Sequence, residues 1–142
     1  LVTSDQEEFK KLLDIFISWA FLETYILEML AVKENINIIF TKAFTDFQSN
    51  LAIFERAIIL TNHFILAKVP SLVDSLQEIY KVYASSICSG NYFLTFNIRT
   101  RNALIWGVHL LFEYYSHFAF ENMEQFKPVY ISRCIEEMKK IF

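Results

Sequence analysis

The sequence LLDIFISWAFLETYILEMLAV, residues 12–32, decides the fold class. Apolar residues recur in it at helical spacing, and residues 15–22 are apolar at nearly every position. A helix that is apolar on all sides must be covered on all sides, so we expect this one to lie buried at the centre of a multi-helix sandwich. Asp14, Glu23 and Glu28 fall within the stretch, and three carboxylates make a membrane crossing costly. The stretch is therefore predicted to be a core helix of a soluble domain.

The residues in front of this stretch carry the signals of a helix start. Thr3, Ser4 and Asp5 are good N-cap residues, and Glu7 follows Ser4 by three positions, which is the spacing of a capping box. Asp5, Glu7 and Glu8 also place negative charge at the positive end of the helix dipole. We therefore expect the helix to begin here and to end near residues 33–35.

The composition excludes several classes of protein. The chain has 142 residues, which fits a single helical domain over residues 1–142. Two glycines and two prolines are too few for an all-β fold or for a glycine-rich phosphate loop. The 13 basic and 16 acidic residues are mixed along the chain without a basic stripe, so we expect no direct contact with nucleic acid.

The chain is also unusually apolar. Hydrophobic residues make up 54% of it, compared with about 45–50% in average soluble domains. The excess predicts a thick core, a ligand cavity or a subunit interface, and the thick core is the simplest of the three. The aromatic run at residues 112–120 fits core or interface, and Gly107 would let a neighbouring helix approach closely.

The middle of the chain predicts further helices with few breaks. Residues 36–41 alternate or are β-branched, which leaves room for one short strand or β-hairpin. Ser49 or Asn50 is expected to cap the helix that follows. Val69-Pro70 marks another boundary, because proline disfavours helix at the residue before it and fits the first turn of a new helix.

The last third of the chain completes the predicted fold. We expect a loop at residues 85–91 and a long helix over residues 98–126. Pro128 is predicted to end that pattern before a short final helix over residues 131–142. The predicted fold is all-α, a multi-helix sandwich with a central buried helix and the option of one short β-hairpin.

Three side chains at positions i, i+4 and i+8 raise the question of a metal site. His109, Glu113 and His117 would share one face of a helix, and imidazole and carboxylate are ligands for zinc or iron. A metal site usually draws ligands from more than one element, so a solvated face with i,i+4 pairs is the stronger interpretation. Cys88 and Cys134 cannot build a structural zinc site by themselves and are predicted to be small buried side chains in a reducing compartment. We therefore predict no metal and no cofactor.

No pattern in the sequence fixes a nucleophile beside a base. Cys88 and His63 belong to different segments, and neither a nucleophile elbow nor a spacing of paired acids is present. We therefore predict a protein that binds rather than an enzyme.

Several segments together resemble the ligand-binding domain of nuclear hormone receptors, in the divergent form found in nematodes. Asp5-Gln6, followed by Lys11, is similar to the family's segment that enters its buried central helix. Residues 73–80, VDSLQEIY, resemble its ninth helix, and Arg101 matches the arginine that opens its tenth. Order and spacing are similar across nearly the whole chain, although the family's first helices have no counterpart in it.

The resemblance implies ligand-responsive regulation of transcription in the nucleus. It implies a small apolar ligand in a cavity that is lined by Phe16, Trp19, Ala20 and Glu23. It also implies that coregulator peptide helices dock in a groove marked by Lys11 and Glu137, and that a homo- or heterodimer forms through residues 101–126. Lys139 and Lys140 depart from the apolar pattern of the family's final helix.

An alternative is a helical protein-interaction module with no small-molecule ligand, similar to Bcl-2-like proteins that bind a partner helix in a groove. The groove motif of those proteins is Trp-Gly-Arg, and Trp106-Gly107-Val108 lacks the arginine. A third interpretation is the ligand-sensing half of a bacterial helical repressor, which would need a DNA-binding pair of helices in addition to these residues.

Overall fold

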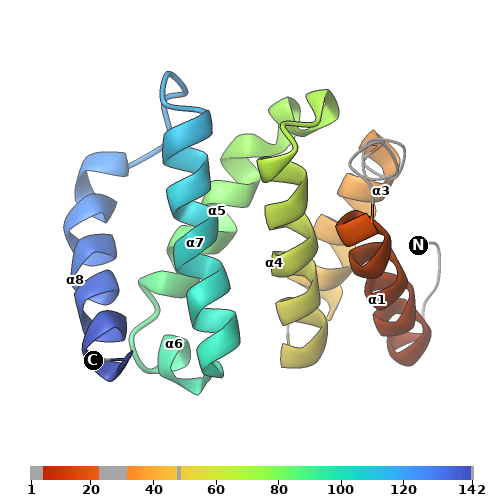
Figure 1. Cartoon of the computed structure of the whole chain (residues 1–142), viewed down its shortest axis with the longest axis horizontal. Coiled ribbons are helices and arrows are strands. Elements are labelled where there is room, and N and C mark those ends of the chain that lie inside the picture. Colours follow the sequence, from red (N-terminus) through yellow and green to blue (C-terminus); the bar gives the residue numbers. More distant parts are fainter. Residues whose placement is uncertain (1–4, 23–31, 48, 142) are drawn as a thin grey trace. The chain divides into compact units, whose positions relative to one another are not determined.

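The computed structural model describes residues 5–22, 32–47 and 49–141, and every regular element in them is a helix (Figure 1). The all-α prediction is therefore confirmed. None of the helices that the structure describes is long and apolar enough to span a membrane. The chain groups into two compact units, Leu1–Ser75 and Leu76–Phe142. The prediction of a single domain stays a prediction.

The first unit contains α1 (Gln6–Leu22), α3 (Lys33–Ile38), the π-helix η1 (Ile39–Asp46), α4 (Leu51–Leu66) and the 3-10 helix η2 (Pro70–Ser75). Asn50 caps α4, because its side chain accepts a hydrogen bond from the backbone N–H of Ile53 at 3.3 Å. Its amide also donates to the side chain of Gln6 at 2.9 Å, and Arg56 donates to Asp14 at 2.6 Å. Since these two contacts advance together along both helices, α1 and α4 lie side by side and run in the same direction (Figure 1).

The core of this unit is centred on α4. Nine of its 16 residues are buried, so α4 takes the buried position that the sequence predicts for residues 12–32. The helix α1 contributes Phe9 and Leu13, which are both fully buried. Ile15 and Trp19 lie on its other side by the 3.6-residue period, and their side chains are 42% and 43% exposed.

The prediction that this helix has no exposed face is therefore wrong for the part of α1 that is described. Residues 23–31 of the predicted helix lie outside the described residues. An apolar side chain can be buried only where a neighbour covers it, and the contact with α4 uses one face of α1. Helical periodicity shows which residues can be buried, and packing decides which of them are.

Residues 36–41 are helical, so the predicted short strand or β-hairpin is wrong. The helix α3 continues directly into η1, which ends where the backbone N–H of Phe47 donates to the carbonyl of Lys42, five residues earlier, at 2.6 Å. Ile36 and Ile39 are each 2% exposed and lie on one side of this segment. Burial of that side outweighs the β propensity of isoleucine and threonine, which is a preference set largely by context.

The second unit contains α5 (Leu76–Ile87), α6 (Asn91–Thr95), α7 (Ile98–Tyr114) and α8 (Met123–Ile141). Two contacts tie α7 to α8. Arg101 Nε donates to Glu137 Oε1 at 2.8 Å, and the hydroxyl of Tyr130 lies 3.4 Å from the carbonyl oxygen of Ile105. The partner positions fall along α8 as they rise along α7, so the two helices are antiparallel.

Aromatic side chains form much of the core of the second unit. Tyr80 of α5 is 2% exposed, and its ring centroid lies 4.7 Å from that of Phe120 and 5.6 Å from that of Phe126. Phe112 of α7 lies 6.2 Å from Tyr80 and 5.9 Å from Tyr130 of α8. The aromatic run that the sequence assigns to core or interface therefore contributes to the core.

The boundaries of the last two helices differ from the prediction. The helix α7 ends at Tyr114 and α8 already begins at Met123, so a single helix over residues 98–126 and a break at Pro128 are both wrong. Pro128 lies close to the N-terminal end of α8, where its missing N–H removes one backbone hydrogen bond. Phe126, which is 5% exposed, anchors the turn before it in the aromatic core.

Candidate functional site

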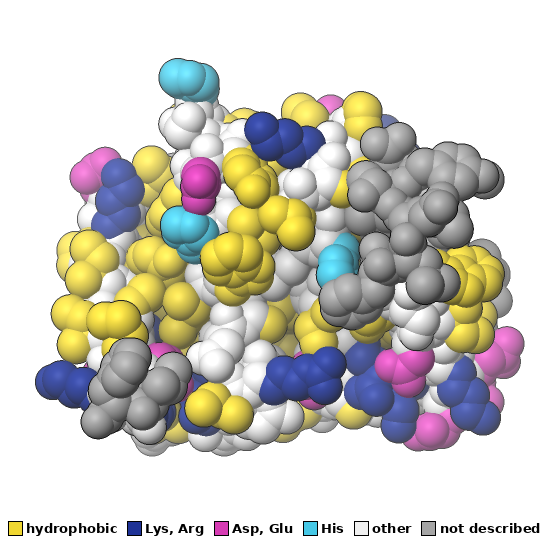
Figure 2. Space-filling view, viewed as in Figure 1, with side chains coloured by type: hydrophobic (Ala, Val, Ile, Leu, Met, Phe, Trp, Pro, Cys, Tyr) yellow, Lys and Arg dark blue, Asp and Glu magenta, His cyan; other side chains and the backbone are white. Residues whose placement is uncertain are grey.

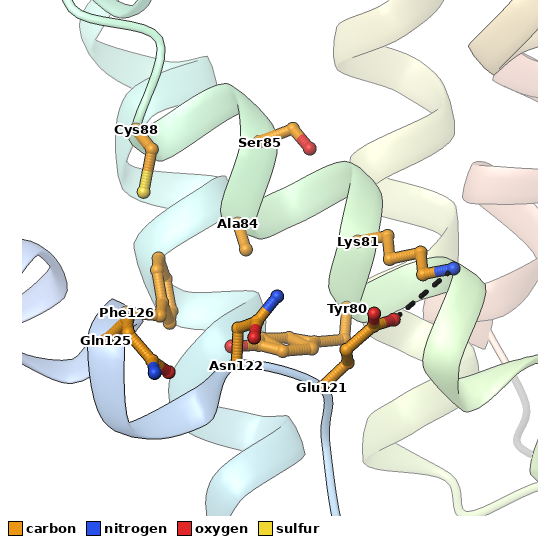
Figure 3. A pocket seen from close by; sticks show the side chains of 9 residues that line it. All are labelled: Tyr80, Lys81, Ala84, Ser85, Cys88, Glu121, Asn122, Gln125 and Phe126. Atoms are coloured by element: carbon orange, nitrogen blue, oxygen red, sulfur yellow. Dashed lines mark ion pairs between the residues drawn. The ribbon is translucent and has the colours of Figure 1, made fainter.

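Two hollows of similar size lie against α8 in the second unit, and both have volumes within the range of about 300–1,000 Å³ that is typical of small-molecule sites. The first, the α5–α8 cleft, has a volume of about 420 Å³ (Figure 3). It is lined by Tyr80, Lys81, Ala84, Ser85, Cys88, Glu121, Asn122, Gln125 and Phe126. The second, the α7–α8 groove, has a volume of about 410 Å³. It is lined by Asn102, Ile105, Trp106, His109, Tyr130, Cys134, Glu137 and Met138.

The α5–α8 cleft has an aromatic floor and a charged rim. The rings of Tyr80 and Phe126 that line it are already buried against the aromatic core. At one end Lys81 and Glu121 form an ion pair, with Nζ and Oε2 3.6 Å apart (Figure 3). Both side chains are more than half exposed, so water solvates the pair and its net contribution to stability is small.

Cys88 lies at the opposite end of this cleft from the ion pair (Figure 3). Partial burial of the thiol raises its pKa above the ordinary value, and the charge of Arg133 opposes this shift in part. A raised pKa favours the neutral thiol, which is a weaker nucleophile than the thiolate. The residue as a whole is exposed, and the prediction that both cysteines are buried is wrong for Cys88, because it follows the last turn of α5.

Exposed apolar side chains line the α7–α8 groove. Trp106 of α7 is 50% exposed, and its ring stacks on that of His109 with centroids 5.4 Å apart. Met138 of α8 is 53% exposed. Ile131 and Ile135 of the same helix are also exposed, outside the lining of the groove. Figure 2 shows hydrophobic side chains gathered over α7 and α8. Large exposed apolar patches are a common feature of binding surfaces.

A buried ion pair accompanies these apolar walls. Glu137 is 5% exposed, and its Oε1 accepts hydrogen bonds from Arg101 Nε at 2.8 Å and from Lys140 Nζ at 3.1 Å. Arg101 also donates to the carbonyl oxygen of Phe96 at 2.6 Å, which fixes the guanidinium in place. Two positive charges therefore surround one negative charge beside the groove.

The second carboxylate oxygen of Glu137 differs from the first in its hydrogen bonding. Oε2 is buried and has no hydrogen-bond partner within the described part of the chain. The Tyr130 hydroxyl in the same groove is directed to the carbonyl oxygen of Ile105. An unsatisfied buried acceptor costs about 1–3 kcal/mol, so buried polar groups nearly always have a partner. The groove thus combines apolar walls with one buried acceptor that has no hydrogen-bond partner among the described residues.

The ligand-binding residues implied by the resemblance lie in the first unit. Phe16 and Trp19 stack on α1 with centroids 6.2 Å apart, and Trp19 is exposed rather than enclosed. Ala20 belongs to α1, but its side chain is outside what the structure describes, as is Glu23 altogether. Their role as a ligand cavity stays a prediction.

The two residues predicted for a coregulator groove belong to different units. Lys11 is exposed on α1, whereas Glu137 is buried on α8 and bound by Arg101 and Lys140. A clamp on the end of a partner helix needs charged groups at the surface. The joint assignment of Lys11 and Glu137 to such a groove stays a prediction. In the structure Glu137 pairs with Arg101.

The predicted histidine spacing is only partly realised. His109 Nε2 lies 2.8 Å from Glu113 Oε2, and this i,i+4 pair is half exposed on α7. His117 lies beyond the end of the helix at Tyr114, so it does not continue the same face. Among the residues searched, those with a described placement, no group of three His, Cys, Asp or Glu side chains could hold a metal ion.

The sequence contains half of the signal for the α7–α8 groove. Asn102, Trp106 and His109 follow helical spacing, so their common face could be recognised from periodicity. The burial of Glu137 could not, because its partner Arg101 is 36 residues away. Comparison of the chain with protein-family models, curated proteins and solved structures finds no match. The resemblance to nuclear receptors therefore stays a prediction.

Proposed function

We propose that this chain is a non-catalytic binding module that takes a small, mainly apolar ligand in the α7–α8 groove. One observation carries the proposal: half-exposed Trp106 and Met138 line the same 410 Å³ groove as a buried carboxylate with a vacant oxygen. A ligand in this place would remove apolar surface from water and supply a partner for a buried acceptor. Mostly apolar walls with a few placed polar groups are the usual composition of a small-molecule site.

The α5–α8 cleft supports the same function less well, although it is as large. Its charged groups, Lys81 and Glu121, already bind each other and are solvated. Its aromatic floor is covered from below by other rings, so a ligand would bury little further aromatic surface. The gain on binding is therefore larger in the groove.

A ligand between α7 and α8 would hold these two helices together. It would favour the packed position of α8 over any looser one, because a ligand shifts a conformational equilibrium by its difference in affinity for the two states. We propose that this response regulates transcription in the nucleus, as the resemblance to nuclear receptors implies. The support for that role is the order and spacing of the segments from Asp5-Gln6 to Arg101.

Titration calorimetry with 2-methoxynaphthalene, an apolar probe, tests the binding function. We expect saturable binding to the wild-type chain with one site. Trp106→Ala should weaken it about tenfold, because an aromatic ring contributes roughly 0.5–1.5 kcal/mol beyond its buried area. Trp19→Ala is the matched control, since it removes another half-exposed tryptophan that does not line the groove.

Two results would contradict the proposed function. One is the absence of saturable binding both for this probe and for naphthalene probes that carry a polar group, which would favour the alternative of a protein-interaction module without a small ligand. The other is an equal loss of affinity in Trp106→Ala and Trp19→Ala, which would place the probe outside the groove.

A further inference from the structure

The charges around Glu137 restrict the chemistry of a ligand in the α7–α8 groove. Glu137 Oε1 is bound by Arg101 and Lys140, whereas Oε2 has no partner among the residues described. The Glu137 side chain is buried, with 6% of its surface exposed. A group held this firmly cannot turn to water, so any partner for Oε2 has to come to it.

Both kinds of charged ligand fit this arrangement poorly. An organic ammonium ion would bring a third positive charge to a site where Arg101 and Lys140 already outnumber the carboxylate. An acid would bring its oxygens against Oε2, which accepts hydrogen bonds and donates none. A neutral O–H or N–H group avoids both penalties and makes a hydrogen bond to a charged acceptor, which is stronger than one between neutral groups.

We propose that the ligand of the α7–α8 groove is a neutral, mainly apolar molecule with one O–H or N–H donor, which binds Glu137 Oε2. This inference rests on the proposed function. The aromatic walls, Trp106 and Tyr130, favour a flat ring as the apolar part. Because Oε2 lies below the surface, the donor reaches it by moving a lining side chain aside, and the half-exposed, flexible Met138 is suited to that movement.

A matched pair of probes tests the inference without altering the protein. The probe 2-naphthol has the same ring as 2-methoxynaphthalene, but its oxygen carries a proton that can be donated. At neutral pH we expect 2-naphthol to bind about tenfold more tightly or better, as a hydrogen bond to a charged group allows. We expect 2-naphthylmethylamine, as the ammonium ion, and 2-naphthoate to bind more weakly than 2-naphthol.

The possible outcomes separate this inference from the function on which it rests. If none of the four probes binds, the proposed function fails. If 2-naphthol and 2-methoxynaphthalene bind equally, the function stands and the neutral-donor inference is overturned. If the ammonium ion or the carboxylate binds more tightly than 2-naphthol, the inference is likewise overturned, because a charged ligand would then be preferred.

Substitution of the acceptor locates the hydrogen bond. Glu137→Gln should reduce the preference for 2-naphthol over its methyl ether to about threefold or less, because the acceptor loses its charge. Glu136→Gln is the control, since Glu136 is the half-exposed neighbour that pairs with Arg133 at 3.2 Å. A preference that survives in Glu137→Gln would show that the ligand donates its hydrogen bond to another acceptor, which would overturn the inference. Because Glu137→Gln can lower stability, thermal unfolding of both variants is measured first. If the variant does not fold, the relative affinities of 2-naphthol and 2-methoxynaphthalene for the wild-type chain decide the inference.

Discussion

The two hollows beside α8 are alike in size and opposite in the placement of their polar and apolar groups. In the α5–α8 cleft the ion pair lies at the surface and the aromatic rings lie underneath. In the α7–α8 groove the rings of Trp106 and His109 lie at the surface and the ion pair of Arg101 and Glu137 lies underneath. Water solvates the polar groups of the cleft. In the groove, water contacts apolar rings and does not reach the buried carboxylate oxygen. Two hollows of similar volume thus differ in what a ligand would gain by binding there.

The difference also predicts how the two ion pairs contribute to stability. The buried pair is short, at 2.8 Å, and its side chains are 14% and 6% exposed. The pair at the rim of the cleft is longer, at 3.6 Å, and its side chains are 51% and 61% exposed. A buried charge that loses its partner cannot recover solvation, whereas an exposed one recovers it at once.

The largest effect is expected from Arg101→Met, which leaves the carboxylate of Glu137 buried with Lys140 as its remaining partner. The variant should be destabilised by about 3–5 kcal/mol, measured by urea unfolding. The double variant Arg101→Met, Glu137→Met should recover much of this loss, because two apolar side chains leave no uncompensated charge. A loss below about 1 kcal/mol in the single variant would show that the buried pair behaves like a surface pair.

Phe126→Leu tests the aromatic core, to which residues that line the cleft and the groove both contribute. Phe126 lines the cleft, and its ring lies 5.6 Å from Tyr80 and 5.8 Å from Tyr130 of the groove. The loss of these ring contacts should lower the free energy of unfolding by about 2 kcal/mol. Because the ring supports both hollows, binding of 2-naphthol should weaken as well. Unchanged affinity for 2-naphthol would show that the groove keeps its shape without support from the core.

Local sequence signals predict the parts of this fold that depend on near neighbours. Asp5 accepts a hydrogen bond from the backbone N–H of Glu7 at 2.9 Å, as expected at a helix start. Asn50 caps α4, and Gly90 has a φ of +63° in the turn between α5 and α6. These features follow from side chains within three residues of one another, so a short window of sequence contains their cause. The predicted loop over residues 85–91 is too long, because α5 continues to Ile87 and α6 begins at Asn91.

The parts that the sequence does not predict depend on contacts between distant segments. The π-helix η1 and the helical state of residues 36–41 result from burial of Ile36 and Ile39, which overrides local β propensity. The groove depends on Arg101 meeting Glu137 across 36 positions. A surface helix and a buried one can share the same apolar pattern. Periodicity therefore could not show that α4, rather than α1, is the helix at the centre of the core.

A smaller effect on the free energy of unfolding is expected from Tyr130 of the groove at alkaline pH. Burial raises the pKa of Tyr130 far above its ordinary value of about 10. The fold therefore holds the neutral phenol, while the unfolded chain releases the proton once the pH exceeds about 10. The contribution of Tyr130 is fully present below that pH and is lost as the pH rises above it.

Tyr130→Phe is the variant that checks this effect. It should change stability by less than about 1 kcal/mol at neutral pH, because its hydrogen bond to the Ile105 carbonyl is long, at 3.4 Å. Its stability should then fall less steeply than that of the wild type in urea unfolding at alkaline pH. The same slope in both proteins would mean that other groups cause the alkaline loss.

The smallest effect is expected at the rim of the α5–α8 cleft. Lys81→Met removes one partner of the exposed ion pair, and Glu121 then gains water in place of the ammonium group. The free energy of unfolding should change by less than about 1 kcal/mol, and the affinity of the groove for 2-naphthol should not change. A larger loss of stability would show that exposure does not set the strength of this pair. A loss of affinity would show that the two hollows are coupled through α8, because Lys81 lines only the cleft.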